Sequence, residues 1–158
     1  MIDEKRRTLL KGTLAGGLVG AAIGAGLLKP SDLLAATWPE PAFKSKKVED
    51  ALKALYGTAE TEASDAIHIK APAIAENGAV VPITVSTTLP DVEAISLIAK
   101  ENPFPLTSHY QLADNTLGYI ACRIKMGKTS DVIAVVKSGG KLYSAKKLVK
   151  VTIGGCGG

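Results

Sequence analysis

Beyond residue 66, apolar and polar residues alternate in short runs, and a period of two is the pattern of half-buried β-strands. Turn-forming residues separate the runs, among them Asn77-Gly78, Asn102-Pro103 and Gly139-Gly140. Seven strands are predicted, at residues 66–70, 80–87, 94–100, 117–126, 132–137, 141–145 and 147–153. Short strands with such regular punctuation favour an all-β fold, an antiparallel β-sandwich of the immunoglobulin-like type.

One amphipathic helix is predicted ahead of the strands. Four apolar residues recur with helical spacing: Val48, Ala51, Leu52 and Leu55. Gly57 is a suitable stop, because glycine readily takes the left-handed conformation that ends many helices. Residues 37–47 are rich in Pro, Lys and Ser and are predicted to be a linker, so the domain is expected to span residues 48–153.

Residues 1–36 have the organisation of an export signal. A basic start containing the adjacent Arg6 and Arg7 precedes an uncharged run at residues 12–28, and this pairing resembles a twin-arginine signal. The run is shorter than the roughly 20 residues of a membrane-spanning helix. We expect cleavage after Ala35 or Ala36, with export to the periplasm and no stable membrane anchoring afterwards. The alternative is an uncleaved N-terminal anchor helix.

Cleavage would change the charge of the chain. The signal holds five of the 19 basic and three of the 15 acidic residues, so the mature net charge falls from +4 to +2. The basicity of the whole chain is therefore weak evidence for nucleic-acid binding, and an aromatic content of 4% argues against a base-stacking surface. Two widely separated cysteines cannot form a Cys₄ zinc site, and no metal or cofactor is expected.

Two features of the predicted strands bear on chemistry. Alternation places Cys122 on the same face as Ile120 and Ile124, which predicts a buried core thiol; a disulfide with Cys156 is the alternative. His68 points away from the isoleucines beside it and is predicted to be a solvated surface histidine.

The second histidine has a different context. His109 follows the Pro-rich turn at residues 102–105 and is predicted to lie in a loop. Loops often carry recognition residues, so a place near a recognition surface is one interpretation, with loop position as its only support.

The chain ends in an unusual five-residue motif: Gly154, Gly155, Cys156, Gly157 and Gly158. Because the predicted last strand runs directly into this motif, its glycines are not needed to reverse the chain. Five residues at roughly 3.3 Å each give a flexible arm with a reach of about 16 Å. A thiol there is suited to carrying a group into a partner's cleft, since no acid or base adjoins it. The alternatives are a disordered tail with an incidental cysteine, and an intermolecular disulfide.

These residues resemble the SoxY family, the sulfur carriers of the thiosulfate-oxidising Sox system. The ending at residues 149–158 carries most of the resemblance. Four internal stretches are also similar, at residues 76–82, 101–103, 123–126 and 135–137. The likeness extends from the export signal to the last residue, and Cys122 is the departure from the family pattern.

The resemblance implies an immunoglobulin-like sandwich that forms a heterodimer with SoxZ and carries covalent sulfur on Cys156. It further implies that the haem c protein SoxAX joins thiosulfate to that thiol and that the di-manganese hydrolase SoxB releases sulfate. In some organisms the molybdenum and haem protein SoxCD then oxidises the remaining sulfane sulfur. The cofactors belong to these partners, so this chain is expected to be a carrier subunit and not an enzyme.

Three other functions stay open from the residues. The terminal Gly157-Gly158 is shared with carriers activated as a thiocarboxylate, but that route needs cytosolic enzymes and conflicts with an export signal. A thiol-dependent oxidoreductase or sulfurtransferase would lack a CxxC pair and an evident base. A structural module dimerised through Cys156 is the third.

Overall fold

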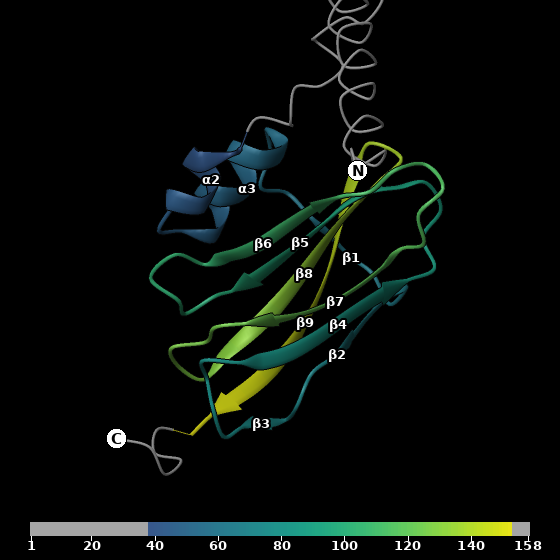
Figure 1. Ribbon diagram of the computed structural model, residues 1–158. Helices are drawn as coiled ribbons and strands as arrows, with labels where there is room; N and C mark the ends of the chain where they lie inside the picture. Colours follow the sequence, from purple (N-terminus) through teal and green to yellow (C-terminus); the bar gives the residue numbers. More distant parts are fainter. Residues whose placement is uncertain (1–37, 153–158) are drawn as a thin grey trace, which may run out of the picture. The chain divides into compact units, whose positions relative to one another are not determined.

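Two β-sheets stacked face to face are the main feature of the computed structural model, which describes residues 38–152 (Figure 1). The larger sheet has the strand order β1-β9-β8-β5-β6, with β3 also paired to β9. Its strands are β1 (Glu62–Ala63), β3 (Ile74–Ala75), β5 (Val92–Ala99), β6 (Leu106–Gln111), β8 (Ser130–Ser138) and β9 (Lys141–Val151). The smaller sheet has the order β2-β4-β7, with β2 (Ile67–Lys70), β4 (Val81–Thr87) and β7 (Tyr119–Ile124).

The main core lies between the sheets. Alternation along each strand turns every second side chain inward, so Ile83 and Val85 from β4 meet Leu97 from β5 and Val136 from β8. These four side chains are at most 1% exposed. Burying an aliphatic side chain of this size stabilises the fold by about 1.5–3 kcal/mol. The period of two is clearest in β4, which has one buried face, whereas β5 is buried on both faces because helices cover its outer side.

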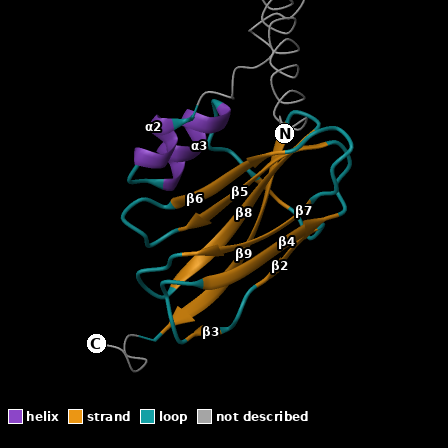
Figure 2. Ribbon diagram, viewed as in Figure 1, coloured by secondary structure: helices purple, strands orange, loops and turns teal. Residues whose placement is uncertain are grey.

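Two helices cover the outer face of the larger sheet (Figure 2). Helix α3 (Val48–Tyr56) is the predicted amphipathic helix, and Gly57 ends it with a φ of 79° while its N–H donates to the Lys53 carbonyl oxygen at 2.9 Å. Its buried stripe packs on strands β5, β6 and β8 and on Leu142 at the start of β9. Neither helix among the described residues is long and apolar enough to cross a bilayer.

The stretch predicted to be a linker contains a helix. Helix α2 (Glu40–Lys44) spans five residues, and its Ala42 is fully buried. Pro41 occupies the first turn, where its missing N–H costs nothing. One short turn of helix shows too little periodicity to be recognised in sequence, because its single buried side chain leaves no stripe.

The strand predictions are largely confirmed, but one pair of predicted strands is a single strand and three strands, β1, β3 and β6, were not predicted. Strand β9 is continuous over 11 residues, where two strands separated at Lys146 were predicted. Lys146 is exposed, and the ammonium of Lys147 lies 3.4 Å from the Ile69 carbonyl oxygen, so consecutive lysines do not interrupt the strand. Strand β6 was not predicted, because Thr-Ser-His-Tyr shows no apolar alternation. Short strands β1 and β3 run parallel to β9, whereas the longer strands pair antiparallel.

The β8–β9 hairpin is confirmed at its predicted turn. Ser138 pairs with Lys141, and the two glycines between them have φ values of 53° and 77°. Positive φ at both central residues defines a type I′ turn, the two-residue turn whose twist matches that of paired strands. The Gly140 N–H also donates to the Glu93 carboxylate at 2.8 Å. A hydrogen bond from Lys137, followed by this N–H, holds the pKa of Glu93 below its ordinary value.

This turn generates a stability prediction. Gly140→Ala is expected to lower the free energy of unfolding by about 1 kcal/mol, because a Cβ is disfavoured at positive φ. Gly140→Asn is the matched variant and should lose less, since Asn tolerates this conformation. Urea unfolding followed by circular dichroism measures both. Equal stability of Gly140→Ala and the parent chain would contradict the turn assignment.

Candidate functional site

The last described residues of β9 are held along one edge by strand β3. Register pairs Ile74 with Lys150 and Ala75 with Val151. Beyond this pairing, the Lys150 N–H donates to the Ala73 carbonyl oxygen at 3.0 Å, and the Thr152 N–H donates to the Ala75 carbonyl oxygen at 3.1 Å. The backbone is therefore fixed up to Thr152, two residues before the terminal glycine motif begins.

The opposite side of the same strand end is held by a side chain. Val151 donates its N–H to Thr129 Oγ1 at 3.0 Å, and the Thr129 hydroxyl lies 3.4 Å from the Val151 carbonyl oxygen. Thr129 belongs to the loop between β7 and β8. A single threonine thus serves both backbone groups of Val151, and the end of β9 is gripped from two sides.

Two more loops are tied to that β7–β8 loop. Met126 donates its N–H to the Gly78 carbonyl oxygen at 2.7 Å, which joins the loop between β3 and β4. Asn102, from the loop between β5 and β6, donates Nδ2 to the Lys125 carbonyl oxygen at 2.7 Å and accepts from the Gly127 N–H at 3.0 Å. Three loops distant in sequence therefore form one hydrogen-bonded base around the end of β9.

Three of the four internal stretches that resemble the family meet in this base. Asn77 and Gly78 come from residues 76–82, Asn102 from residues 101–103, and Lys125 with Met126 from residues 123–126. Sequence reasoning found each stretch but not their contact, because no local pattern encodes the register that brings them together. Their common location indicates that they support the strand end.

Gly78 is required by the close approach of these loops. A Cβ built on Gly78 would lie 2.3 Å from the Met126 carbonyl oxygen and 2.8 Å from Val151 Cγ1. Neither position leaves space for a methyl group. By contrast, a Cβ on Gly127 would meet only Asn102 Oδ1 at 3.8 Å, an ordinary van der Waals distance.

The predicted site residues lie outside the part of the chain that the structure describes. These are the terminal motif, Gly154, Gly155, Cys156, Gly157 and Gly158, and the two export-signal arginines, Arg6 and Arg7. Their roles stay predictions. The structure instead defines the surface from which the chain continues after Thr152.

Cys122 corrects one prediction. It lies on the predicted face of β7, beside the main core, but it is half-buried and not fully enclosed. The reason is its strand, because β7 is an edge of the smaller sheet and has a neighbour on one side only. Cys122 lies beside Tyr110 of β6. Burial is the main cause that raises the pKa of Tyr110, and the hydrogen bond with the Cys122 thiol is the second. Cys122 has no disulfide partner among the described residues.

His109 corrects another prediction, since it lies in strand β6 and not in a loop. Its Nδ1 is 2.9 Å from the Ser96 hydroxyl, which in turn is 2.7 Å from the Tyr56 hydroxyl. The Tyr56 and His109 rings also meet edge to face, with centroids 5.8 Å apart. These hydrogen bonds join helix α3 to strands β5 and β6. The sequence did not predict them, because Tyr56 and Ser96 are 40 residues apart.

Burial determines the pKa shifts of the two titratable groups in the Tyr56–Ser96–His109 hydrogen bonds. Desolvation lowers the pKa of His109, which favours a neutral ring that can accept a hydrogen bond at Nδ1. Desolvation raises the pKa of Tyr56, and the hydrogen bond with Ser96 partly opposes this. A serine beside a neutral histidine resembles a nucleophile with its base, but Ser96 is fully buried beneath the helix and no substrate can reach it. The Tyr56–Ser96–His109 hydrogen bonds therefore attach α3 to the sheet.

The remaining candidates are the other histidine and a surface groove. His68 is exposed, as predicted. A groove of about 700 Å³ lies between helix α3, residues 59–68 and strands β8 and β9, and Ser64, Asp65 and His68 are among the residues that line it. Within residues 38–152, no three His, Cys, Asp or Glu side chains gather as a metal site would require.

Comparisons with known proteins agree with this architecture. A family model described as SoxY, sulfur oxidation protein SoxY, matches residues 52–156. The solved structure of the sulfur carrier protein SoxY from Chlorobium limicola f thiosulfatophilum is similar at 42% identity and a TM-score of 0.62, over 68% of this chain and 97% of that one. No curated protein matches the chain. The all-β, immunoglobulin-like fold expected from the sequence is confirmed.

A more distant structure shares the fold alone. The superoxide reductase (neelaredoxin) from Ignicoccus hospitalis is similar with a TM-score of 0.52 at 16% identity, over 58% of this chain and 95% of that one. At such low identity, a common fold does not transfer an activity.

The hydrogen-bonded base generates a prediction about Gly78. Gly78→Ala is expected to lower the free energy of unfolding by about 1–3 kcal/mol, because its methyl group would overlap the Met126 carbonyl oxygen. Gly127→Ala is the control in the same base and should change stability by less than about 0.5 kcal/mol. Chemical unfolding measures both. A harmless Gly78→Ala substitution would show that the loops are not in contact.

The Tyr56–Ser96–His109 chain generates a pH prediction. Because burial lowers the folded-state pKa of His109, its contribution is present above the ordinary histidine pKa and is lost as pH falls through the folded-state value. The hollow beside the ring also contains Glu93 and Lys137, which pair with each other. Unfolding free energies measured from about pH 7.5 to pH 4.5 should fall less steeply in His109→Gln.

His68→Gln is the matched control for this effect. His68 is exposed, so its replacement should leave the slope of stability against pH unchanged. Parallel slopes for the parent chain and His109→Gln would overturn the assignment of acid sensitivity to His109.

Proposed function

The chain belongs to the SoxY family, and from this membership we propose that it is a covalent sulfur carrier of the Sox thiosulfate oxidation pathway, with Cys156 as the attachment site. The observation that carries the proposal is the junction of a fixed strand end with the terminal glycine-cysteine motif. Backbone N–H groups of β9 and Thr152 donate to the Ala73 and Ala75 carbonyl oxygens and to the Thr129 hydroxyl, and these bonds hold the strand as far as Thr152. The thiol lies four residues further along the chain.

This junction fits a carrier for a geometric reason. Four residues at roughly 3.3 Å each let Cys156 reach about 13 Å from Thr152, and the small volume of glycine suits entry into a narrow cleft. Because the backbone is held at Thr152, the thiol can reach only the space around this point. The arm supplies reach, while the domain supplies its position.

The proposed chemistry divides between the carrier and its partners. Oxidative coupling joins the Cys156 thiol to the outer sulfur of thiosulfate, releases one proton and passes two electrons to the haem c partner SoxAX. The product is a cysteine S-thiosulfonate. Hydrolysis by SoxB then adds water, releases sulfate and two protons, and leaves a persulfide anion on Cys156. SoxCD would oxidise the remaining sulfane sulfur where it is present.

The chain itself is proposed to be a carrier subunit and not an enzyme. Its Ser96 hydroxyl, the one that adjoins His109, is fully buried, which supports leaving catalysis to the partners. We further propose a heterodimer with SoxZ and a periplasmic location reached through the twin-arginine signal around Arg6 and Arg7. Membership of the Sox family supports partners of this system in general.

The carrier proposal is tested by the position of the sulfur adduct. Incubation with SoxZ, SoxAX, thiosulfate and an electron acceptor should add one thiosulfonate to the intact protein, at Cys156. Cys156→Ser should abolish both the adduct and pathway turnover. Mass spectrometry of the intact protein and of its peptides provides the measurement.

Cys122→Ser is the matched control. The half-buried Cys122 lies in the domain and not in the terminal motif, so its replacement should leave sulfur loading unchanged. An adduct located on Cys122 would contradict the proposed carrier site.

A further inference from the structure

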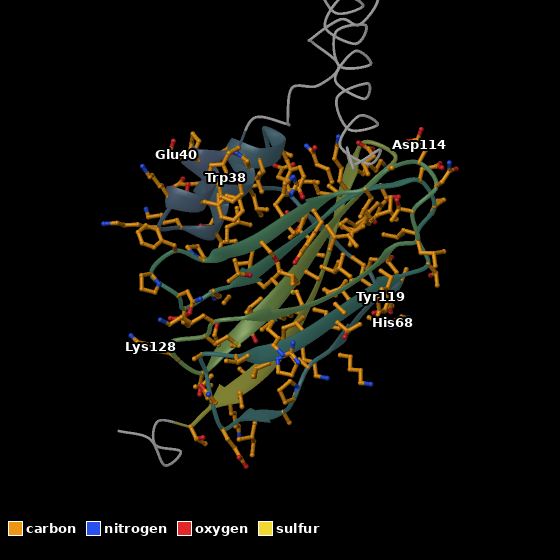
Figure 3. The ribbon with its side chains drawn as sticks, in the orientation of Figure 1. Trp38, Glu40, His68, Asp114, Tyr119 and Lys128 are labelled. Carbon is orange, nitrogen blue, oxygen red and sulfur yellow. The ribbon has the colours of Figure 1, made fainter. Side chains whose placement is uncertain are left out.

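The outer face of the smaller sheet is uncovered by any described segment. Both helices pack on the opposite sheet, so the side chains that point outward from β2, β4 and β7 are exposed or half-exposed (Figures 2 and 3). We call this surface the open face. It consists of His68, Lys70, Val80, Pro82, Thr84, Ser86, Tyr119, Ala121, Arg123 and Lys125.

Charge on the open face has one sign. Its strands carry no Asp or Glu, while Lys70 and Arg123 are exposed and Lys125 follows directly after β7. Register places Arg123 beside Pro82, and Lys70 in the next row beside Thr84. With neighbouring strands about 4.8 Å apart, these cations gather in one half of the sheet.

Apolar surface accompanies the cations. Tyr119 is 54% exposed and Val80 is 50% exposed, with Pro82 and Ala121 exposed between them. Register places Tyr119 and His68 in one row of this face, on either side of Ser86 in the central strand (Figure 3). Tyrosine and arginine beside small apolar residues are typical of the centres of protein interfaces, where an aromatic ring and a guanidinium provide much of the affinity.

The cationic half of the open face adjoins the end of β9. Lys125 accepts a hydrogen bond from Asn102 through its carbonyl oxygen, and its neighbour Met126 donates to Gly78. Thr129 in the same loop holds Val151. A protein that covered the cations would therefore lie beside the point from which the chain continues toward Cys156.

We propose that the open face docks an acidic surface patch on a Sox enzyme that acts on the Cys156 thiol. This inference rests on the proposed carrier function and adds the surface by which the carrier is recognised. Opposite charge would steer the encounter, and the apolar residues would then exclude water around Tyr119. Recognition by the face leaves the arm free to enter the active site.

Other occupants fit the face less well. A second copy of this chain would bring Lys70, Arg123 and Lys125 against the same cations, which repel each other. Nucleic acids and anionic lipid surfaces are normally bound through more numerous cations, whereas this face mixes three cations with apolar residues. An acidic protein patch with an apolar centre matches both components.

The test measures docking separately from sulfur transfer. The test uses the full chain with the Cys156→Ser substitution, in complex with SoxZ. Biolayer interferometry measures its affinity for purified SoxAX and for purified SoxB of the same organism. Reversing two charges with Arg123→Glu and Lys125→Glu should weaken binding to at least one enzyme by about tenfold or more. Added salt should weaken the parent complex more than the variant complex.

The matched control reverses two exposed lysines away from the open face, Lys46→Glu and Lys53→Glu, and should change the affinity by less than about twofold. Thermal unfolding establishes that both variants fold. Equal affinity of the open-face variant and the parent for both enzymes would overturn the proposal. Heparin or anionic vesicles that bind the parent as tightly as the enzymes do would also overturn it. So would loss of self-association, or loss of the complex with SoxZ in gel filtration, as the only effect of the open-face variant.

Sulfur loading of the chain with Cys156 intact separates this proposal from the carrier function. Normal docking without an adduct on Cys156 contradicts the carrier proposal and supports the docking surface. An adduct on Cys156 with unchanged binding by the open-face variant contradicts the docking surface alone.

Discussion

Backbone pairing along β9 is the constraint on which the rest of the structure depends. One edge of this strand pairs with β8 over nine residue pairs, and its other edge is occupied by β1 near the hairpin and by β3 near its end. The strand therefore connects the glycine turn at residues 139–140 to the last described residue, Thr152, without interruption. Because hydrogen bonds on both edges fix its direction, the chain leaves the domain at a defined place.

The loops around the end of β9 hold this strand in position. Hydrogen bonds of Asn102, Gly78 and Thr129 hold the neighbouring loops to one another and to β9. The helices cover the larger sheet, and Tyr56, Ser96 and His109 fasten them there, so the smaller sheet keeps its outer face uncovered. In the two proposals, that face binds a Sox enzyme and the Cys156 thiol carries the sulfur.

Local patterns predicted the elements that depend on local physics. The stripe of α3, its glycine stop and the type I′ hairpin follow from backbone geometry within a few residues, and all three were predictable. Strand β6 was not, since its burial depends on helices that pack on it from far away in sequence. The half-buried state of Cys122 was also missed, because a strand pattern reveals which face is inward but not whether the strand lies at an edge.

The sequence by itself determined the family, the alternating strands of the sandwich and the terminal motif with its single thiol. It also separated Cys156 from Cys122, one at the chain end and the other in a strand. Only the tertiary structure decided that residues 76–82, 101–103 and 123–126 meet around the end of β9, and that Lys70 and Arg123 share an uncovered face. The physical reason is sheet register, because hydrogen bonds between strands set contacts among residues that no local pattern relates.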